Sequence, residues 1–349
     1  MKKLKIAILA PIEETVPPTK YGGTELVVYN LITQLVKRGH DVTLFGTGDS
    51  QVPCKIVPIV EKAIRTIPPY DTDPKARETA KWIGIGKILS ELQKDEYDIV
   101  HSNIGWRMAL FAKSLKAPLV TTLHGPIGDP YTSAAYTAVP DLPFVSISNN
   151  QRKGLPTLNF INTVYNGIDV SKFLFREKPE DYLLFLGRFS PEKGPEIAID
   201  VAKRTGKRLI IVAKIDQVDR AFYDLHKEKI DGKQIQFVGE ISFDEKVKLL
   251  GGASALLAPI QWEEPFGLNV TEAMACGTPV LGCPRGSFPE IIVDGKTGFL
   301  SSTTDDMTER ISHISELNRR ECRTRVESYF SIEKMADGYE RVYLKVINK

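Results

Sequence analysis

One loop of this sequence combines two cations with glycines, directly after a predicted strand. Arg188 and Lys193 lie five residues apart within residues 186–194. Arginine offers a planar fork to phosphate oxygens, lysine acts as a mobile point charge, and glycines allow a ligand close to the backbone. The loop therefore suits a diphosphate, while two solvated surface cations remain the alternative reading of the loop alone.

A second segment, residues 262–280, carries the carboxylates of Glu264 and Glu272. Pro265 suits the first turn of a helix that would end near Gly277. This places Glu264 at the helix entrance and Glu272 about two turns inside. Two such carboxylates can hold separate hydroxyl groups of one extended ligand, with its phosphates at the helix N-terminus. Acids that merely favour the helix dipole are the alternative, which explains neither the Pro-Phe-Gly turn nor an inward Glu272.

The third segment places Gly22 and Gly23 before a helix that we expect to have Thr24 as its N-cap and to end at Gly39. Free N–H groups there can accept an anion, or the two glycines form only a turn. The first strand is not followed by G-x-G-x-x-G, so the sequence argues against a dinucleotide site for hydride transfer.

Elements that alternate along the whole chain position these loops. Short β-branched runs alternate with helical patterns, which is typical of parallel sheets covered by helices. We predict two Rossmann-like α/β domains, residues 1–165 and 181–330, with a linker at 166–180 and a helix within 331–349. In such folds the strand carboxyl ends face a cleft that binds ligands. The expected strands are residues 5–10, 41–45, 56–60, 98–101, 118–123, 144–147, 163–165, 182–186, 209–213, 235–238, 255–259, 279–282 and 298–301.

The composition of the chain argues against further classes of function. The 349 residues carry 46 basic and 44 acidic side chains, a net charge of +2, which argues against a nucleic-acid partner. The longest apolar runs are too short for a transmembrane segment. The basic and apolar start is followed by Glu13 and Glu14 without a cleavage site, so we read it as a first strand. Four cysteines without a C-x-x-C pair are typical of reduced thiols in a cytoplasmic protein.

No metal site is expected. The five histidines show no metal-binding spacing. Asp71 and Asp73 form a D-x-D string, but it lies in a Pro-rich segment and reads as a loop ahead of a helix.

Taken together, the motifs resemble the family-4 retaining glycosyltransferases of the GT-B fold, whose E-x7-E signature matches Glu264 and Glu272. The resemblance covers nearly the whole chain. It includes, in order, the segments 22–23, 122–125, 165–169, 187–194, 288–290 and 294–300. It implies two Rossmann-like domains facing a central cleft, an acceptor-binding first domain, a nucleotide-sugar-binding second domain and a C-terminal helix that packs back on the first.

The resemblance also implies roles for individual residues. Arg188 and Lys193 would neutralise the donor diphosphate, Glu264 would bind hydroxyls of the donor sugar, and Glu272 would accept the ribose hydroxyls. Arg188, Lys193 and Glu264 would be the catalytic residues. The other donor-binding positions would be Gly22, Gly23, His124, Asn166, Val238, Ile241, Phe266, Gly267 and Leu268.

The implied reaction moves a hexose from a UDP- or GDP-sugar, UDP being favoured, to an acceptor hydroxyl with retention. No metal or other cofactor is expected. Three alternatives stay open: inversion with His124 as base, a sugar-nucleotide epimerase, and a non-catalytic sugar-nucleotide binder. Epimerases lack the segment from Glu264 to Glu272, and a silent binder would lose a site cation or glutamate.

The sequence says less about the biosynthetic role, the location and the acceptor. The expected role is biosynthesis of glycoconjugates, polysaccharides or small-molecule glycosides in the cytoplasm, with peripheral membrane association left open. The acceptor is undetermined, because the loops of the first domain show no decipherable pattern, and a soluble one is slightly favoured.

Overall fold

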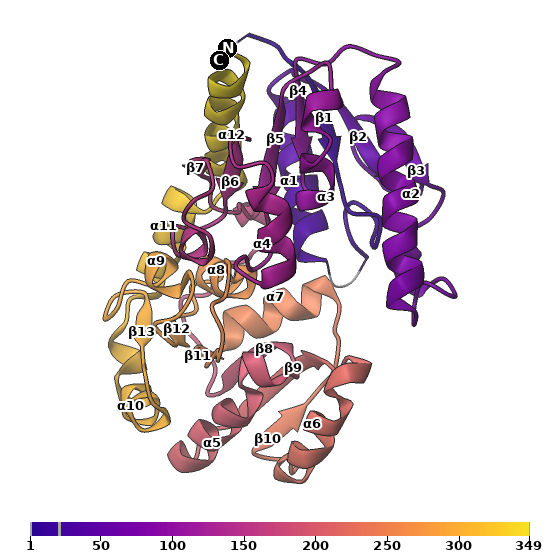
Figure 1. Cartoon of the computed structure of the whole chain (residues 1–349). Coiled ribbons are helices and arrows are strands. Elements are labelled where there is room, and N and C mark those ends of the chain that lie inside the picture. The colour runs from indigo at the N-terminus through magenta and orange to yellow at the C-terminus, as the bar shows by residue number, and fades with distance from the viewer. Residues whose placement is uncertain (1, 20–21, 349) are drawn as a thin grey trace. The chain divides into compact units, whose positions relative to one another are not determined.

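The computed structural model describes residues 2–19 and 22–348 and divides into two compact units. The first comprises Met1–Gly167 with Ile332–Lys349, and the second comprises Ile168–Ser331. Each is an α/β unit built on one parallel sheet, so the predicted pair of Rossmann-like folds is confirmed (Figure 1).

The first unit has a seven-stranded sheet in the order β3-β2-β1-β4-β5-β6-β7. Strand β1 lies in the middle, where Ile6 is opposite Val42 on one side and Ile99 on the other. The strands are Lys5–Leu9 (β1), Asp41–Thr47 (β2), Lys55–Val60 (β3), Ile99–Ser102 (β4), Leu119–Leu123 (β5), Phe144–Ser146 (β6) and Phe160–Thr163 (β7). The helices are Gly23–Lys37 (α1), Pro74–Leu92 (α2), Trp106–Ala109 (α3), Pro130–Thr137 (α4) and Ile332–Ile347 (α12).

The second unit has a six-stranded sheet in the order β10-β9-β8-β11-β12-β13. Its strands are Leu183–Arg188 (β8), Leu209–Lys214 (β9), Ile235–Phe237 (β10), Ala255–Ala258 (β11), Val280–Gly282 (β12) and Gly298–Leu300 (β13). Its helices are Pro195–Thr205 (α5), Arg220–His226 (α6), Phe243–Gly252 (α7), Leu268–Ala275 (α8), Phe288–Ile291 (α9), Thr304–Arg310 (α10) and Arg319–Tyr329 (α11).

Two local predictions need correction. Helix α1 begins at Gly23 with Gly22 as its N-cap, so Thr24 is not the cap. The seventh strand ends at Thr163 rather than beginning there. The boundary between the two units, between Gly167 and Ile168, lies within the predicted linker of residues 166–180, in which Ile168 and Phe173 are buried.

Other expectations on loops and thiols are confirmed. Asp73 is the N-cap of α2 and its side chain accepts a hydrogen bond from the Lys75 N–H, so the D-x-D string does precede a helix. All four cysteines are free, and three of them are buried. No helix in the described part of the chain is both long and apolar enough to cross a membrane.

Helix α12 packs on the first unit, as the resemblance implied, and contacts α1 and the sheet (Figure 1). Arg38 at the end of α1 forms an ion pair with Asp337 at 2.8 Å. The buried carboxylate of Glu340 accepts a hydrogen bond from Arg38 and is 3.0 Å from Nε2 of His40. A buried charge is stable only when it is paired in this way, so these contacts fix α12 against the end of α1.

A buried polar network joins the same helix to β4 and β5. His101 Nδ1 is 2.8 Å from the Tyr343 hydroxyl, and its Nε2 is 2.8 Å from the Thr122 hydroxyl. Thr122 also contacts the hydroxyl of Tyr339 at 3.0 Å. Burial lowers the pKa of His101 to about 3. The imidazole therefore stays neutral in the folded protein down to acid pH.

We predict that this histidine makes the first unit less stable as pH falls below about 6.5. In this range the unfolded chain binds a proton at His101 and the folded chain does not. The free energy of unfolding therefore falls by about 1.4 kcal/mol per pH unit until the pH nears the folded pKa. Urea unfolding at pH 7, 6 and 5 should show a shallower loss of stability in His101→Gln than in the wild type. The exposed His313→Gln should keep the wild-type slope, and equal slopes in all three proteins would contradict the prediction.

Candidate functional site

The predicted cationic loop follows β8. Arg188 is the last residue of β8, in register with Lys214 of β9. Lys193 ends a short 3-10 helix, Pro191–Lys193, and the next residue, Gly194, adopts a left-handed conformation with φ of 69°. A Cβ at Gly194 would lie 2.1 Å from the Pro259 carbonyl oxygen. Glycine is required here, and it lets the loop turn sharply into α5.

Lys193 and Glu264 form the centre of the site. The Lys193 ammonium donates a hydrogen bond to Oε2 of Glu264 and lies 4.9 Å from the centre of the Trp262 ring. The indole N–H of Trp262 donates to the same carboxylate oxygen at 3.1 Å. The side chains of Lys193 and Glu264 are only 17% and 12% exposed, so this pair is largely shielded from water. The structure thus brings together two residues that the sequence separates by 71 positions.

The Glu264 loop has a different geometry from the prediction. Helix α8 begins at Leu268, with Gly267 as N-cap at φ 90°, so Pro265 lies in the loop and not in a first helical turn. A Cβ at Gly267 would lie 2.7 Å from the ring of Phe288. The Ser287 N–H donates to the Glu264 carbonyl at 2.9 Å. Packing against the segment that follows β12 therefore sets the position of Glu264.

Glu272 lies inside α8 and is buried, with 5% of its surface exposed. It is the fifth residue of the helix, just over one turn from its start and not two. Lys246 of α7 donates a hydrogen bond to its carboxylate at 2.7 Å. The ammonium of Lys246 also lies 5.2 Å from the ring centre of Phe243. Lys246 thus neutralises and orients the buried carboxylate.

Three carboxylates surround Arg188. Its guanidinium donates to Glu192, and it lies 3.8 Å from a carboxylate oxygen of Asp216 and 3.7 Å from one of Asp219. Burial raises the pKa of Asp219, although Arg188 opposes the shift. The guanidinium therefore has a fixed position, and an incoming anion must compete with these carboxylates.

The remaining predicted residues of the second unit lie around these groups. Phe266 is buried and its carbonyl accepts the hydroxyl of Ser287, while Leu268 opens α8. Val238 follows β10, is 45% exposed, and donates its N–H to Ile211 at 3.0 Å. Ile241 immediately precedes Ser242, the N-cap of α7, which carries Lys246.

The other predicted residues belong to the first unit. Gly22 approaches Pro18 so closely that a Cβ there would lie 2.6 Å from the proline ring, and Gly23 is the first residue of α1. His124 follows β5 and its Nε2 is 2.8 Å from the amide oxygen of Asn103. Burial lowers the pKa of His124 to about 4. Asn166 is buried, and its Oδ1 has no hydrogen-bond partner within the described residues.

Sequence reasoning missed three contributors to this geometry, Glu192, Lys246 and Trp262. Glu192 and Trp262 lie within the motifs, but no sequence pattern distinguishes them from their neighbours. Lys246 lies in an ordinary amphipathic helix. Across residues 2–19 and 22–348, no three or more His, Cys, Asp or Glu side chains gather as they would around a metal ion.

The arrangement can bind a polar, anionic molecule with several hydroxyl groups. Arg188 at the end of β8 and Lys193 in the turn that follows supply two cations. Glu264 lies in the loop before α8 and Glu272 lies inside α8, and the N-terminus of this helix, the positive end of its dipole, is at Leu268. Positive charge and N–H groups suit phosphates, and carboxylates suit hydroxyls.

Comparison with known proteins identifies the family. Residues 21–172 match the family model described as Glycosyltransferase Family 4, and residues 169–329 match Glycosyl transferases group 1. The N-acetyl-alpha-D-glucosaminyl L-malate synthase of Bacillus anthracis is 26% identical, covering 93% of this chain and 94% of the relative.

Solved structures show the same fold. Sucrose-phosphate synthase from Thermosynechococcus elongatus superposes with a TM-score of 0.82 at 20% identity, over 99% of this chain and all of that one. Anabaena HepE in complex with UDP-glucose gives 0.75 at 16% identity, over 98% of this chain and all of that one. The two matched segments together span most of the sequence, and the chain belongs to the family-4 glycosyltransferases of the GT-B fold.

Proposed function

We propose that the second unit binds a nucleoside-diphosphate hexose and that the enzyme transfers the hexose to an acceptor hydroxyl with retention. The observation that carries the proposal is the shielded contact between Lys193 and Glu264, with Trp262 beside them. It joins a phosphate-binding cation to a hydroxyl-binding carboxylate at one place.

Arg188 and Lys193 stabilise the transition state of the proposed reaction. Cleavage of the anomeric bond leaves a diphosphate that gains negative charge while the sugar becomes cationic. Arg188 and Lys193, each held by carboxylates before the donor arrives, stabilise that charge more in the transition state than in the ground state. Because fixed cations fill this role, we propose that the reaction needs no metal ion.

The glutamates position the two ends of the donor. Glu264 accepts hydroxyls of the hexose, and Glu272 accepts the ribose hydroxyls while Lys246 holds its carboxylate in position. The backbone around Val238 and Ile241 holds the base. A uracil base is favoured, since HepE, which shares the fold, is described in complex with UDP-glucose.

Retention rests on the weakness of the alternative base. An inverting reaction needs a base on the face opposite the leaving group, and His124 is the candidate for this role. With a pKa of about 4, its neutral imidazole is a poor proton acceptor near pH 7. The departing phosphate oxygen takes the acceptor proton on the same face instead.

The acceptor is a hydroxyl on a soluble molecule in the cytoplasm. Support comes from the relatives, one named for malate and another for a sugar phosphate.

A thermal-shift screen of UDP-glucose, UDP-N-acetylglucosamine and GDP-mannose tests the proposal, because a ligand that binds only the folded state raises Tm. We expect UDP-sugars to raise Tm more than GDP-sugars do. A GDP preference would overturn the choice of base, and the absence of any shift would overturn the donor site.

Glu272→Ala is predicted to weaken donor binding about 100-fold, or about 2.7 kcal/mol, since it removes charged hydrogen bonds to the ribose. Titration calorimetry measures this, with the exposed Glu309→Ala on α10 as control. Glu272→Ala also leaves Lys246 unpaired. The double variant with Lys246→Met separates the two causes: if it regained wild-type affinity, the role of Glu272 would be structural only.

A further inference from the structure

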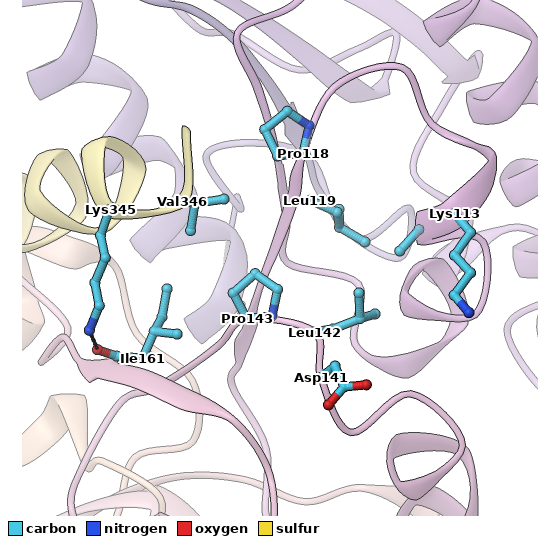
Figure 2. Close-up of a pocket in the computed structure, with 10 residues that line it drawn as sticks. Lys113, Pro118, Leu119, Asp141, Leu142, Pro143, Ile161, Lys345 and Val346 are labelled. Carbon is cyan, nitrogen blue, oxygen red and sulfur yellow. Dashed lines mark hydrogen bonds between the residues drawn. The ribbon is translucent and has the colours of Figure 1, made fainter. Parts of the chain in front are cut away.

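A cavity of about 280 Å³ opens in the first unit where two strands of the sheet begin (Figure 2). Pro118 immediately precedes β5, and Pro143 immediately precedes β6. Substrate sites of such folds lie at the other, carboxyl ends of the strands, where His124 follows β5. The cavity is therefore separate from the residues of the proposed function and does not rest on that proposal.

The walls of the cavity are apolar. Leu119, Leu142, Ile161 and Val346 line it together with the two prolines. The proline nitrogens carry no hydrogen, and the carbonyls of Pro118 and Pro143 already accept hydrogen bonds from the sheet. The two prolines thus offer few hydrogen-bonding groups to a peptide backbone. Burial of apolar surface is the available source of affinity for a ligand.

Three charged side chains stand at the rim. Figure 2 shows Lys113 and Lys345 on opposite sides of the two prolines, and Asp141 beside Leu142. Lys345 donates one hydrogen bond to the Ile161 carbonyl at 3.1 Å and keeps two ammonium protons for other acceptors. Within the described residues, neither Lys113 nor Asp141 takes part in an ion pair. Two cations against one carboxylate leave the rim with an excess of positive charge.

Size and charge together define a ligand class. A chemical group the size of a water molecule occupies roughly 30 Å³, so the cavity has room for an apolar ligand of about nine such groups. We propose that this cavity is an accessory site for an anionic amphiphile, with its medium-length hydrocarbon chain against the prolines and its anionic head at Lys113 and Lys345.

Calorimetric titration of the full chain with decanoate, below its micellar concentration, tests the site. We expect saturable binding with a negative heat-capacity change, the mark of apolar burial. Lys113→Glu should weaken it about fivefold and Asp141→Asn should tighten it about twofold, as expected for charges near a surface. Decanol, which has no charge, should bind the wild type and Lys113→Glu equally.

Lys116→Glu is the matched control, because Lys116 lies three residues further on, is exposed and does not line the cavity. Absence of saturable decanoate binding, or equal weakening by Lys113→Glu and Lys116→Glu, would overturn the site. Co-sedimentation with phosphatidylglycerol vesicles distinguishes two sources of the amphiphile. Sedimentation that Lys113→Glu abolishes indicates a membrane lipid, and decanoate binding without sedimentation indicates a free amphiphile.

Discussion

Lys193→Ala is expected to lower kcat of the transferase about 10³-fold, equivalent to about 4 kcal/mol of transition-state stabilisation. The lysine is the cation that contacts Glu264 within the shielded centre of the site, so its loss removes charge compensation where the leaving diphosphate forms. Nucleoside diphosphate release from the best donor of the thermal screen measures the effect.

The control for this variant is Lys207→Ala. Lys207 pairs with Asp181 at 2.7 Å, but the two side chains are 40% and 80% exposed, so the pair contributes little. Circular dichroism should show that both variants fold. A Lys193→Ala enzyme with more than a tenth of wild-type kcat would remove the lysine from the catalytic group.

Gly194→Ala is expected to destabilise the second unit by at least about 3 kcal/mol. The new Cβ would combine a left-handed backbone with an overlap at 2.1 Å from the Pro259 carbonyl oxygen. Relief of that overlap moves the loop that carries Lys193, so activity should fall as well. Urea unfolding monitored by circular dichroism measures the stability.

Gly206→Ala is a closely matched comparison. Gly206 also has φ of 69°, at the other end of α5, but a Cβ there would meet no atom within 4 Å. It should cost only the left-handed backbone penalty, about 1 to 2 kcal/mol. Equal destabilisation by the two variants would show that close packing against Pro259 does not constrain the loop.

The architecture was largely predictable because the strands of parallel sheets have a simple sequence pattern. Runs such as residues 209–213 are buried on both faces and β-branched, and they read as strands without any tertiary information. The alternation of strands and helices then gave both Rossmann-like units, and the match of motif order gave the family.

Loop geometry was predicted less well because distant contacts decide it. Pro265 has the sequence signature of a helix start, yet α8 begins only after Gly267, whose left-handed conformation fits against Phe288. Likewise, no local pattern distinguishes Lys246 from other lysines on amphipathic helices. Its function appears only when α7 and α8 pack and bring it to the buried Glu272. The assigned role of each site residue remains a prediction for the variants described above.

Time-resolved proton NMR of the hexose first released from a UDP-α-hexose by the wild-type enzyme tests the central claim most directly. The anomeric coupling constant identifies the product before mutarotation, and UDP release is followed in the same sample. We predict that the α-anomer forms first and that Lys193→Ala abolishes its formation. A β-anomer formed first would contradict retention, and release of sugar unchanged by Lys193→Ala would contradict the assignment of the donor site.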